Sequence, residues 1–186
     1  MPPKVKVTKE DIIDTALDLI RKGGESAFNA RAIAAAMNCS TQPIFSNFTS
    51  MEDLIQQTYN AAYNLYLSFI ENEVNSGKYP KYKSFGMAYI RFAKEERELF
   101  KLLFMCDRSN AALVPTADFE ASVQMIMSAN GISKEKAELI HLEMWSCVHG
   151  IATMHATSFL ELDWELISRI LTDVYQGVRY GYVTGG

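Results

Sequence analysis

The sequence predicts an all-α protein in which an N-terminal three-helix module precedes a larger helical bundle. Apolar residues recur at the spacing of a helical face along most of the 186 residues. No alternation of apolar and polar residues persists long enough to indicate a strand. Residues typical of helix caps and helix stops separate the apolar runs. Together these observations indicate about nine helices and no sheet.

The first three predicted helices are short. The first has Thr8 as its candidate N-cap and ends at a pair of glycines. Asn29 caps a second, alanine-rich helix over residues 30–37. After a short break, a third helix is expected over residues 41–48, and Pro43 is acceptable there because it falls in the first turn.

Longer helices follow, and the chain changes character near residue 50. Ser50 caps a long helix from Met51 to about Asn75. Further helices are expected at about residues 83–94, 98–105, 118–129, 133–157 and 163–180, with 106–117 as the longest loop. Small side chains dominate the helix contacts before residue 50, and aromatic and methionine side chains dominate after it. We therefore predict one domain over residues 1–50 and another over residues 51–186.

Composition and charge limit the class of protein. The net charge of −4 and a pI near 5.4 argue against a basic coat for nucleic acid, although a local patch can still contact phosphates. No stretch of about 20 predominantly apolar residues is present, and the N-terminus lacks the apolar core of a signal peptide. The cysteines are odd in number and form no C-x-x-C pair, which is typical of reduced cytosolic thiols. We therefore expect a cytoplasmic protein without a membrane helix.

No catalytic, metal or cofactor site is predicted. The chain has no G-x-S-x-G sequence, no Gly-rich phosphate loop and no cysteine near a histidine in a nucleophile motif. His141, His149 and His155 share one predicted helix but lie eight and six residues apart. Metal-binding helices use intervals of three or four residues, so core or interface histidines are the better interpretation.

The first fifty residues have the layout of a helix-turn-helix module. The third helix carries polar residues at positions 41, 42, 46 and 47, whereas Ile44 and Phe48 point into the module. A short helix with a polar leading edge and an apolar base can enter the major groove of DNA. Spacing alone fits an arbitrary three-helix packing unit equally well.

A family resemblance favours the first interpretation. Residues 33–54 read IAAAMNCSTQPIFSNFTSMEDL. They resemble the N-terminal domain of tetracycline-repressor (TetR) family transcriptional regulators, whose pattern runs approximately I-A-x-x-A-G-V-S-x-x-x-L-Y-x-H-F-x-S-K-E-E-L. The outright matches are Ile33, Ala34, Ser40, Phe48, Ser50, Glu52 and Leu54, and the near matches are Ile44, Phe45 and Asp53. The glycine stop of the first helix, the helix count and the chain length also agree with the family.

The resemblance implies which residues bind the DNA backbone. Asn29 takes the capping position of the second helix, near a phosphate, and Arg31 lies on the exposed side of that helix. Ser40 caps the third helix, where its hydroxyl or the free backbone N–H groups can hold a phosphate oxygen. Lys9, at the start of the first helix, adds a cation.

The resemblance also implies which residues read bases. Thr41, Gln42 and Pro43 occupy the variable reading positions. Gln42 can pair bidentately with adenine, and the Thr41 methyl group or the Pro43 ring can contact a thymine methyl group. Phe45, Ser46 and Asn47 complete the predicted DNA-binding set.

Three positions depart from the family pattern. Phe45, Asn47 and Met51 stand where the family commonly has Tyr, His and Lys. A tyrosine hydroxyl and a lysine charge, both typical phosphate contacts, are therefore missing, while Asn47 can still donate.

The second domain is predicted to bind a ligand. Its aromatic and methionine side chains fit an ordinary core, but the resemblance implies that some line a cavity between the long fourth helix and the next four helices. The candidates are Tyr63, Tyr66, Tyr89, Phe92, Phe104, Met105 and Trp145. Few Lys or Arg residues interrupt these stretches, so we expect an apolar, aromatic or cationic effector.

A stripe of small residues predicts a helix–helix contact. Ser146, Gly150, Thr153 and Thr157 lie on one face of the predicted helix over residues 133–157. A glycine inside a helix costs about 1 kcal/mol relative to alanine, so Gly150 indicates close packing, either within one subunit or with a partner. The resemblance implies a four-helix dimer interface. In it the last helix supplies Ile167, Ile170, Leu171, Val174 and Val178.

The sequence thus predicts a homodimeric, ligand-responsive DNA-binding transcriptional regulator and not an enzyme. The expected mode is a repressor that a small effector releases from a palindromic double-stranded operator. The alternative is a helical small-molecule-binding or interaction protein whose helix-turn-helix no longer binds DNA, and the departures at residues 45, 47 and 51 keep it open.

The distribution of cations generates a first prediction. After Arg31 the next Lys or Arg is Lys78, so the cations available to DNA are Lys4, Lys6, Lys9 and Arg31. If each neutralises one phosphate, a dimer makes about eight such contacts, which sets an upper bound on the salt dependence of binding. Deleting residues 1–7 should therefore lower the affinity for all DNA sequences alike and flatten the plot of log affinity against log salt. A steep slope that survives the deletion would contradict this assignment.

Overall fold

A computed structural model describes residues 7–106 and 117–183, with the side chains of residues 117 and 118 left out. Within these residues the prediction of an all-α protein is confirmed, because only helices, turns and bends occur. No helix among them is long and apolar enough to cross a lipid bilayer. The elements are α1 (Lys9–Gly23), the 3₁₀-helix η1 (Glu25–Ala27), α2 (Ala30–Ala36), α3 (Gln42–Asn47), α4 (Met51–Asn75), α5 (Lys81–Glu95), α6 (Arg97–Phe104), α7 (Ala117–Asn130), α8 (Lys134–Ala156) and α9 (Trp164–Val183).

The helix ends follow from local chemistry. The Thr8 hydroxyl accepts from the Asp11 N–H at 3.1 Å, and the Asp11 carboxylate accepts from the Thr8 N–H at 3.0 Å, so a complete capping box starts α1. Gly24 ends the helix with a φ of 68°, in the region that favours glycine. Ser50 caps α4 as expected, because its hydroxyl accepts from the Asp53 N–H at 3.2 Å. The 3₁₀ turn η1 was not predicted. Most of the predicted loop over residues 106–117, together with Lys4 and Lys6, lies outside the described residues.

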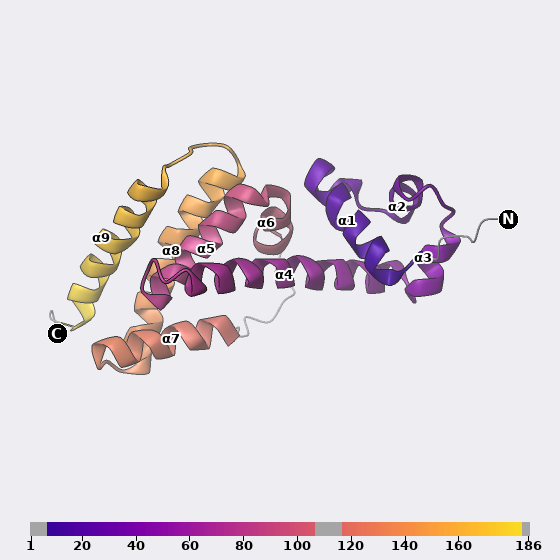
Figure 1. The fold of residues 1–186 in the computed structure, drawn as a ribbon. Helices are drawn as coiled ribbons and strands as arrows, with labels where there is room; N and C mark the ends of the chain where they lie inside the picture. The colour runs from indigo at the N-terminus through magenta and orange to yellow at the C-terminus, as the bar shows by residue number, and fades with distance from the viewer. Residues whose placement is uncertain (1–6, 107–116, 184–186) are drawn as a thin grey trace. The chain divides into compact units, whose positions relative to one another are not determined.

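The chain divides into two compact units, and each unit is formed by two separate segments of the sequence. Unit 1 comprises Met1–Leu67 and Glu96–Cys106, and unit 2 comprises Ser68–Glu95 and Asp107–Gly186. The long helix α4 (Figure 1) therefore contributes residues to both units, and α6 belongs to the unit that contains α1, α2 and α3. This division differs in position from the functional boundary predicted at residue 50, which stays a prediction.

Within unit 1, α6 is joined to α1 and α4 by polar contacts. The Arg21 guanidinium donates to both carboxylate oxygens of Glu96, at 2.8 and 3.0 Å, and to the Asp18 carboxylate at 3.0 Å. The Tyr59 hydroxyl on α4 donates to the Leu103 carbonyl on α6 at 3.1 Å. A bidentate guanidinium–carboxylate pair has fixed geometry, so it positions α1 and α6 with respect to each other.

Within unit 2, α8 is the central helix and packs against α5, α7 and α9 (Figure 1). A Cβ atom placed on Gly86 of α5 would lie 3.1 Å from Val148 Cγ2 on α8 and 3.4 Å from Leu171 Cδ1 on α9. The glycine therefore lets these three helices approach closely. Also on α5, the Arg91 guanidinium donates a hydrogen bond to the carboxylate of the buried Glu73 on α4 at 3.1 Å.

Two tyrosine–histidine pairs cross the contact between α5 and α8. The hydroxyl groups of Tyr82 and Tyr89 lie 3.0 and 2.9 Å from the Nδ1 atoms of His141 and His149, respectively. Burial lowers the pKa of both imidazoles, because the protein interior disfavours the charged form. These histidines are thus part of the packing between helices, as the spacing argument expected.

The lowered histidine pKa values make the stability of the protein depend on pH. Unfolded imidazoles bind protons near pH 6.5, whereas folded His141 and His149 do so at lower pH. Below about pH 6.5 the unfolded state therefore binds more protons, and stability is lost as the pH falls through the folded pKa values. Urea unfolding should show a falling free energy of unfolding from about pH 7.5 to about pH 5.5. The variant with His141→Gln and His149→Gln should lose less over the same range, and an equal loss in both proteins would contradict the assignment.

Candidate nucleic-acid interface

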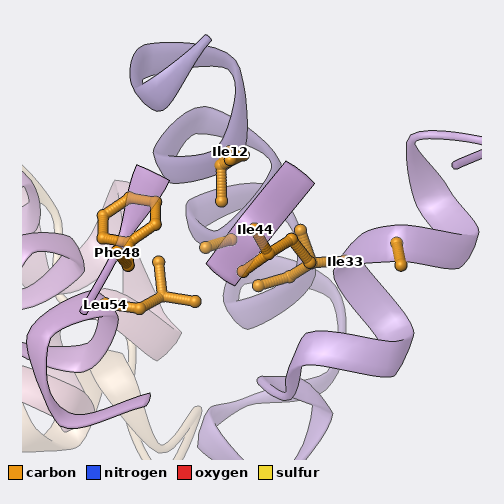
Figure 2. Close-up of a cluster of buried hydrophobic side chains, with 7 residues drawn as sticks. Ile12, Ile33, Ile44, Phe48 and Leu54 are labelled. Atoms are coloured by element: carbon orange, nitrogen blue, oxygen red, sulfur yellow. The ribbon is translucent and has the colours of Figure 1, made fainter. Parts of the chain in front are cut away.

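A buried hydrophobic cluster holds the first three helices and the start of α4 together. Figure 2 shows its labelled side chains converging between these helices. Ile12 from α1, Ile33 from α2 and Ile44 from α3 are fully buried, and Phe48 is only 2% exposed. Its buried members are Ile12, Ala16, Ile33, Ala34, Ile44, Phe48 and Leu54. Because α3 has only six residues, this cluster and not its own helical propensity holds it in place.

The second helix begins as the sequence predicted. The Asn29 side-chain oxygen accepts from the Ala32 N–H at 2.9 Å, so Asn29 is the N-cap of α2. Arg31 is exposed two residues later, while Ile33 and Ala34 turn into the cluster. The cap and the buried face together leave the Arg31 guanidinium directed away from the core.

The turn between α2 and α3 depends on one residue in a left-handed conformation. Asn38 has a φ of 52°, and the following residue, Cys39, donates its N–H to the Ala34 carbonyl at 2.9 Å. The TetR pattern has glycine at the position of Asn38. Asparagine is among the few other residues that tolerate this conformation, so the tight turn forms without glycine.

The outward face of α3 is formed by Gln42, Phe45 and Ser46, which are all exposed. The predicted cap of this helix is wrong, because Thr41 and not Ser40 occupies the N-cap position and no side chain bonds there. Thr41 has helical backbone angles, with a φ of −72° and a ψ of −11°, so the turn leads directly into the helix. Thr41 and Pro43 are half-buried beside this face.

Two polar side chains of α3 bond their own helix. The Asn47 amide nitrogen donates to the Pro43 carbonyl at 2.8 Å, and the Ser46 hydroxyl donates to the Gln42 carbonyl at 2.9 Å. The Ser46 O–H donor is therefore already used, whereas the Asn47 amide keeps a second N–H, and both side chains keep acceptor oxygens. Among the polar side chains predicted to face DNA from α3, Gln42 is the exposed one whose whole amide stays available.

Lys9, the cation predicted to contact DNA from α1, also contacts an aromatic ring within the protein. Its ammonium group lies 5.1 Å from the centre of the Phe48 ring. The Asp53 carboxylate accepts from the Thr49 N–H at 2.9 Å. That bond is the main reason that the pKa of Asp53 is lowered, and the charge of Lys9 contributes a little. The positive charge of Lys9 thus helps slightly to stabilise the ionised Asp53 carboxylate.

Comparisons with known proteins agree with this geometry. Residues 82–174, half of the chain, match the family described as tetracyclin repressor-like, C-terminal domain. The chain belongs to the TetR family. It is therefore a TetR-like transcriptional regulator and not an enzyme.

Solved structures share the fold of the whole TetR-like chain. A protein of unknown function from Rhodococcus sp. RHA1 has a TM-score of 0.72 at 17% identity, covering 99% of this chain and 100% of that chain. A TetR-like transcriptional regulator from the same organism has a TM-score of 0.62 at 15% identity, with all of both chains covered. A putative TetR-family transcriptional regulator from Vibrio parahaemolyticus has a TM-score of 0.62 at 14% identity, covering 91% of this chain and 97% of that chain. No curated protein matches the sequence.

The predicted ligand residues fall into both units of this TetR-family chain. In unit 1, Tyr66 is buried and its ring lies 5.8 Å from that of Tyr63 and 5.1 Å from that of Phe104. Met105, which follows them in the same unit, is 42% exposed. These aromatic rings of α4 and α6 form one group.

In unit 2, the predicted ligand residues differ sharply in burial. Phe92 is fully buried and meets Phe69 edge-on, so it is a core residue. Trp145 is 45% exposed and stacks on His149, with 4.9 Å between ring centres. His149 in turn lies beside Tyr89, which is buried.

The predicted dimer residues divide between the surface and the core. On α8, Ser146 and Thr157 are exposed, and Gly150 and Thr153 are half-buried. On α9, Ile170, Val174 and Val178 are half-buried. Ile167 and Leu171, however, are 0% and 3% exposed within the subunit, so assigning them to an interface was wrong. They lie on the side of α9 that packs against unit 2 itself.

Sequence reasoning missed two exposed leucines on the small-residue face of α8. Leu139 and Leu142 are 43% and 53% exposed, and they precede Ser146 by seven and four residues. Continuing the helical spacing one and two turns towards the N-terminus would have found them. The link between Arg21 and Glu96 had no comparable signal, because the two residues are 75 positions apart.

The left-handed residue of the turn generates a prediction about stability. Replacing Asn38 with alanine places a Cβ-bearing residue without a polar side chain at a φ of 52°. Asn38→Ala should therefore lower the free energy of unfolding by about 1 kcal/mol. Asn38→Gly, the matched control, should be neutral or slightly stabilising. Chemical unfolding of the three proteins checks this, and an equal loss in both variants would show that the conformation is not the cause.

Proposed function

We propose that this protein is a homodimeric repressor that binds a palindromic operator through α3 and leaves it when a small effector binds. The observation that carries the proposal is the outward face of α3, where Gln42 and Phe45 are exposed while Ile44 and Phe48 are buried beneath them. A rigid short helix with free side chains on its outer side suits insertion into a major groove. We further infer that the protein acts in the cytoplasm.

The proposed DNA contacts combine few charges with many neutral groups. Arg31 on α2 reaches the backbone or a groove edge, and Lys9 on α1 adds a second charge. Gln42 reads adenine, because its amide can donate and accept at the same base. The remaining proposed contacts are Asn29, Ser40, Thr41, Pro43, Phe45, Ser46 and Asn47. Binding of this kind releases fewer counterions than a lysine-rich surface does.

The proposed dimer uses the exposed face of α8. No heavy atom elsewhere in the described chain lies within 4 Å of a Cβ placed on Gly150, so the subunit itself does not require a glycine there. Ser146 and Thr157 donate their hydroxyls to Leu142 and Thr153 carbonyls of the same helix, at 2.9 and 2.7 Å. The hydroxyl donors of Ser146 and Thr157 are therefore satisfied within the helix and need no partner across an interface. It suits a second copy of the chain, with α9 contributing Ile170, Val174 and Val178.

The proposed effector is apolar, aromatic or cationic. The aromatic rings of Tyr63, Tyr66 and Phe104 supply apolar surface and negative ring faces, which attract apolar and cationic groups. These rings lie on α4 and α6, and Glu96 immediately before α6 holds Arg21 of α1. An effector that shifts α6 would thus pull on α1, which packs directly against α2 and α3.

Selection of bound fragments from genomic DNA tests the proposal. The full-length protein should enrich a palindromic sequence, since a symmetric dimer presents two copies of α3. Gln42→Ala should cost about 1–3 kcal/mol at one base position of each half-site and relax specificity there. Gln124→Ala on α7 is the matched control and should leave binding unchanged. No enrichment would favour the alternative of a small-molecule-binding or interaction protein without DNA binding.

Sedimentation tests the proposed interface. Because the subunit has room at Gly150, Gly150→Leu should fold normally and yet raise the dissociation constant of the dimer by about tenfold or more through overpacking. Ser128→Leu, on the exposed side of α7, is the matched control and should leave the dimer unchanged. A dimer of unaltered strength in Gly150→Leu would remove α8 from the interface.

A further inference from the structure

The ring of Phe45 does not belong to the buried cluster of unit 1. Phe45 is 51% exposed, whereas the other apolar residues of α3 and its end, Ile44 and Phe48, are 0% and 2% exposed. Other large apolar side chains of unit 1 are also exposed, but Phe45 is the one that lies on α3. A single exposed apolar side chain is common on a protein surface, so its place on the helix proposed to enter DNA is what makes this ring a candidate contact.

The ring shares its face with the side chain proposed to read bases. Phe45 follows Gln42 by three residues, which places both on the same side of α3. Ser46, the third member of this face, donates its O–H to the Gln42 carbonyl and keeps only an acceptor oxygen. The face therefore presents the Gln42 amide, the Phe45 ring and one acceptor oxygen.

A phenyl ring limits what Phe45 can recognise. It has no hydroxyl group or charge with which to hold a phosphate oxygen. In the major groove, the apolar feature of a base pair is the 5-methyl group of thymine, which phenylalanine can contact. Its neighbour Gln42 pairs with adenine, so both side chains of the face favour A·T pairs.

We propose that Phe45 is a specificity-determining residue that reads a thymine methyl group in each half-site of the operator. This inference rests on the proposed function, since it requires α3 to lie in the major groove. It assigns to the ring a sequence-specific contact in place of the phosphate contact that a tyrosine would make. Losing the contact should weaken DNA binding by the free energy of leaving one thymine methyl group exposed to water.

The test compares thymine with deoxyuridine, which differs only by that methyl group. The thymines of the selected operator are replaced by deoxyuridine one position at a time, symmetrically in both half-sites. One replacement should weaken binding of the unaltered protein about fourfold per half-site, the effect of one apolar carbon. Phe45→Ala should weaken binding to the thymine operator and bind the two DNAs equally at that position. Phe45→Leu keeps an apolar side chain and should retain part of the difference.

Controls separate this inference from the proposed function. Gln42→Ala should bind more weakly but keep the full difference between thymine and deoxyuridine. Because Phe45 is exposed, Phe45→Ala should melt at the same temperature as the unaltered protein. If Phe45→Ala keeps the full difference, or if no deoxyuridine replacement weakens the unaltered protein, the inference is overturned while operator binding stands. If no operator is enriched at all, the proposed function fails and this inference falls with it.

Discussion

The burial of Ile44 and Phe48 against Ile12 and Ile33 is the contact on which the proposed DNA-binding surface depends. The helix α3 has six residues, and an isolated helix of that length is unstable in water. Burying each of these side chains contributes about 1.5–3 kcal/mol, enough to hold a short helix that cannot hold itself. The orientation of Gln42 and Phe45 follows from the same contact, because residues one and two positions from the buried Ile44 lie on a different side of the helix.

The surface held in this way is poor in charge, and its polar groups are partly engaged. Asn47 and Ser46 bond carbonyls of their own helix, and the Lys9 ammonium group lies over the Phe48 ring. Arg31 is the exposed cation on α2, and the next Lys or Arg after it in the sequence is Lys78. In the proposed complex, recognition therefore relies on shape, amide hydrogen bonds and apolar contact more than on counterion release. The departures from the family pattern at Phe45 and Asn47 then change the chemistry of the proposed DNA contacts. They do not by themselves indicate loss of DNA binding.

The placement of α6 supplies a physical route for the proposed coupling between effector and DNA. The Arg21–Glu96 pair and the Tyr59–Leu103 hydrogen bond make α6 part of the unit that contains the helix-turn-helix. The aromatic rings proposed to meet the effector lie in the same unit, on α4 and α6. A bidentate ion pair has a narrow range of geometries, so a displacement of α6 is transmitted to α1 more readily than through loose apolar contact.

The sequence by itself determined where the α-helices lie and, except for α3, how the capped ones begin, because caps and apolar periodicity act over a few residues. The caps at Thr8, Asn29 and Ser50 and the span of α4 were all predicted and are all present. Only the tertiary structure decided what each face meets. The apolar spacing of α9 could not separate Ile167 in the core from Ile170 at its edge, since periodicity identifies a face but not its neighbour. The bond between Arg21 and Glu96 spans 75 residues and exists only because folding brings α1 and α6 together.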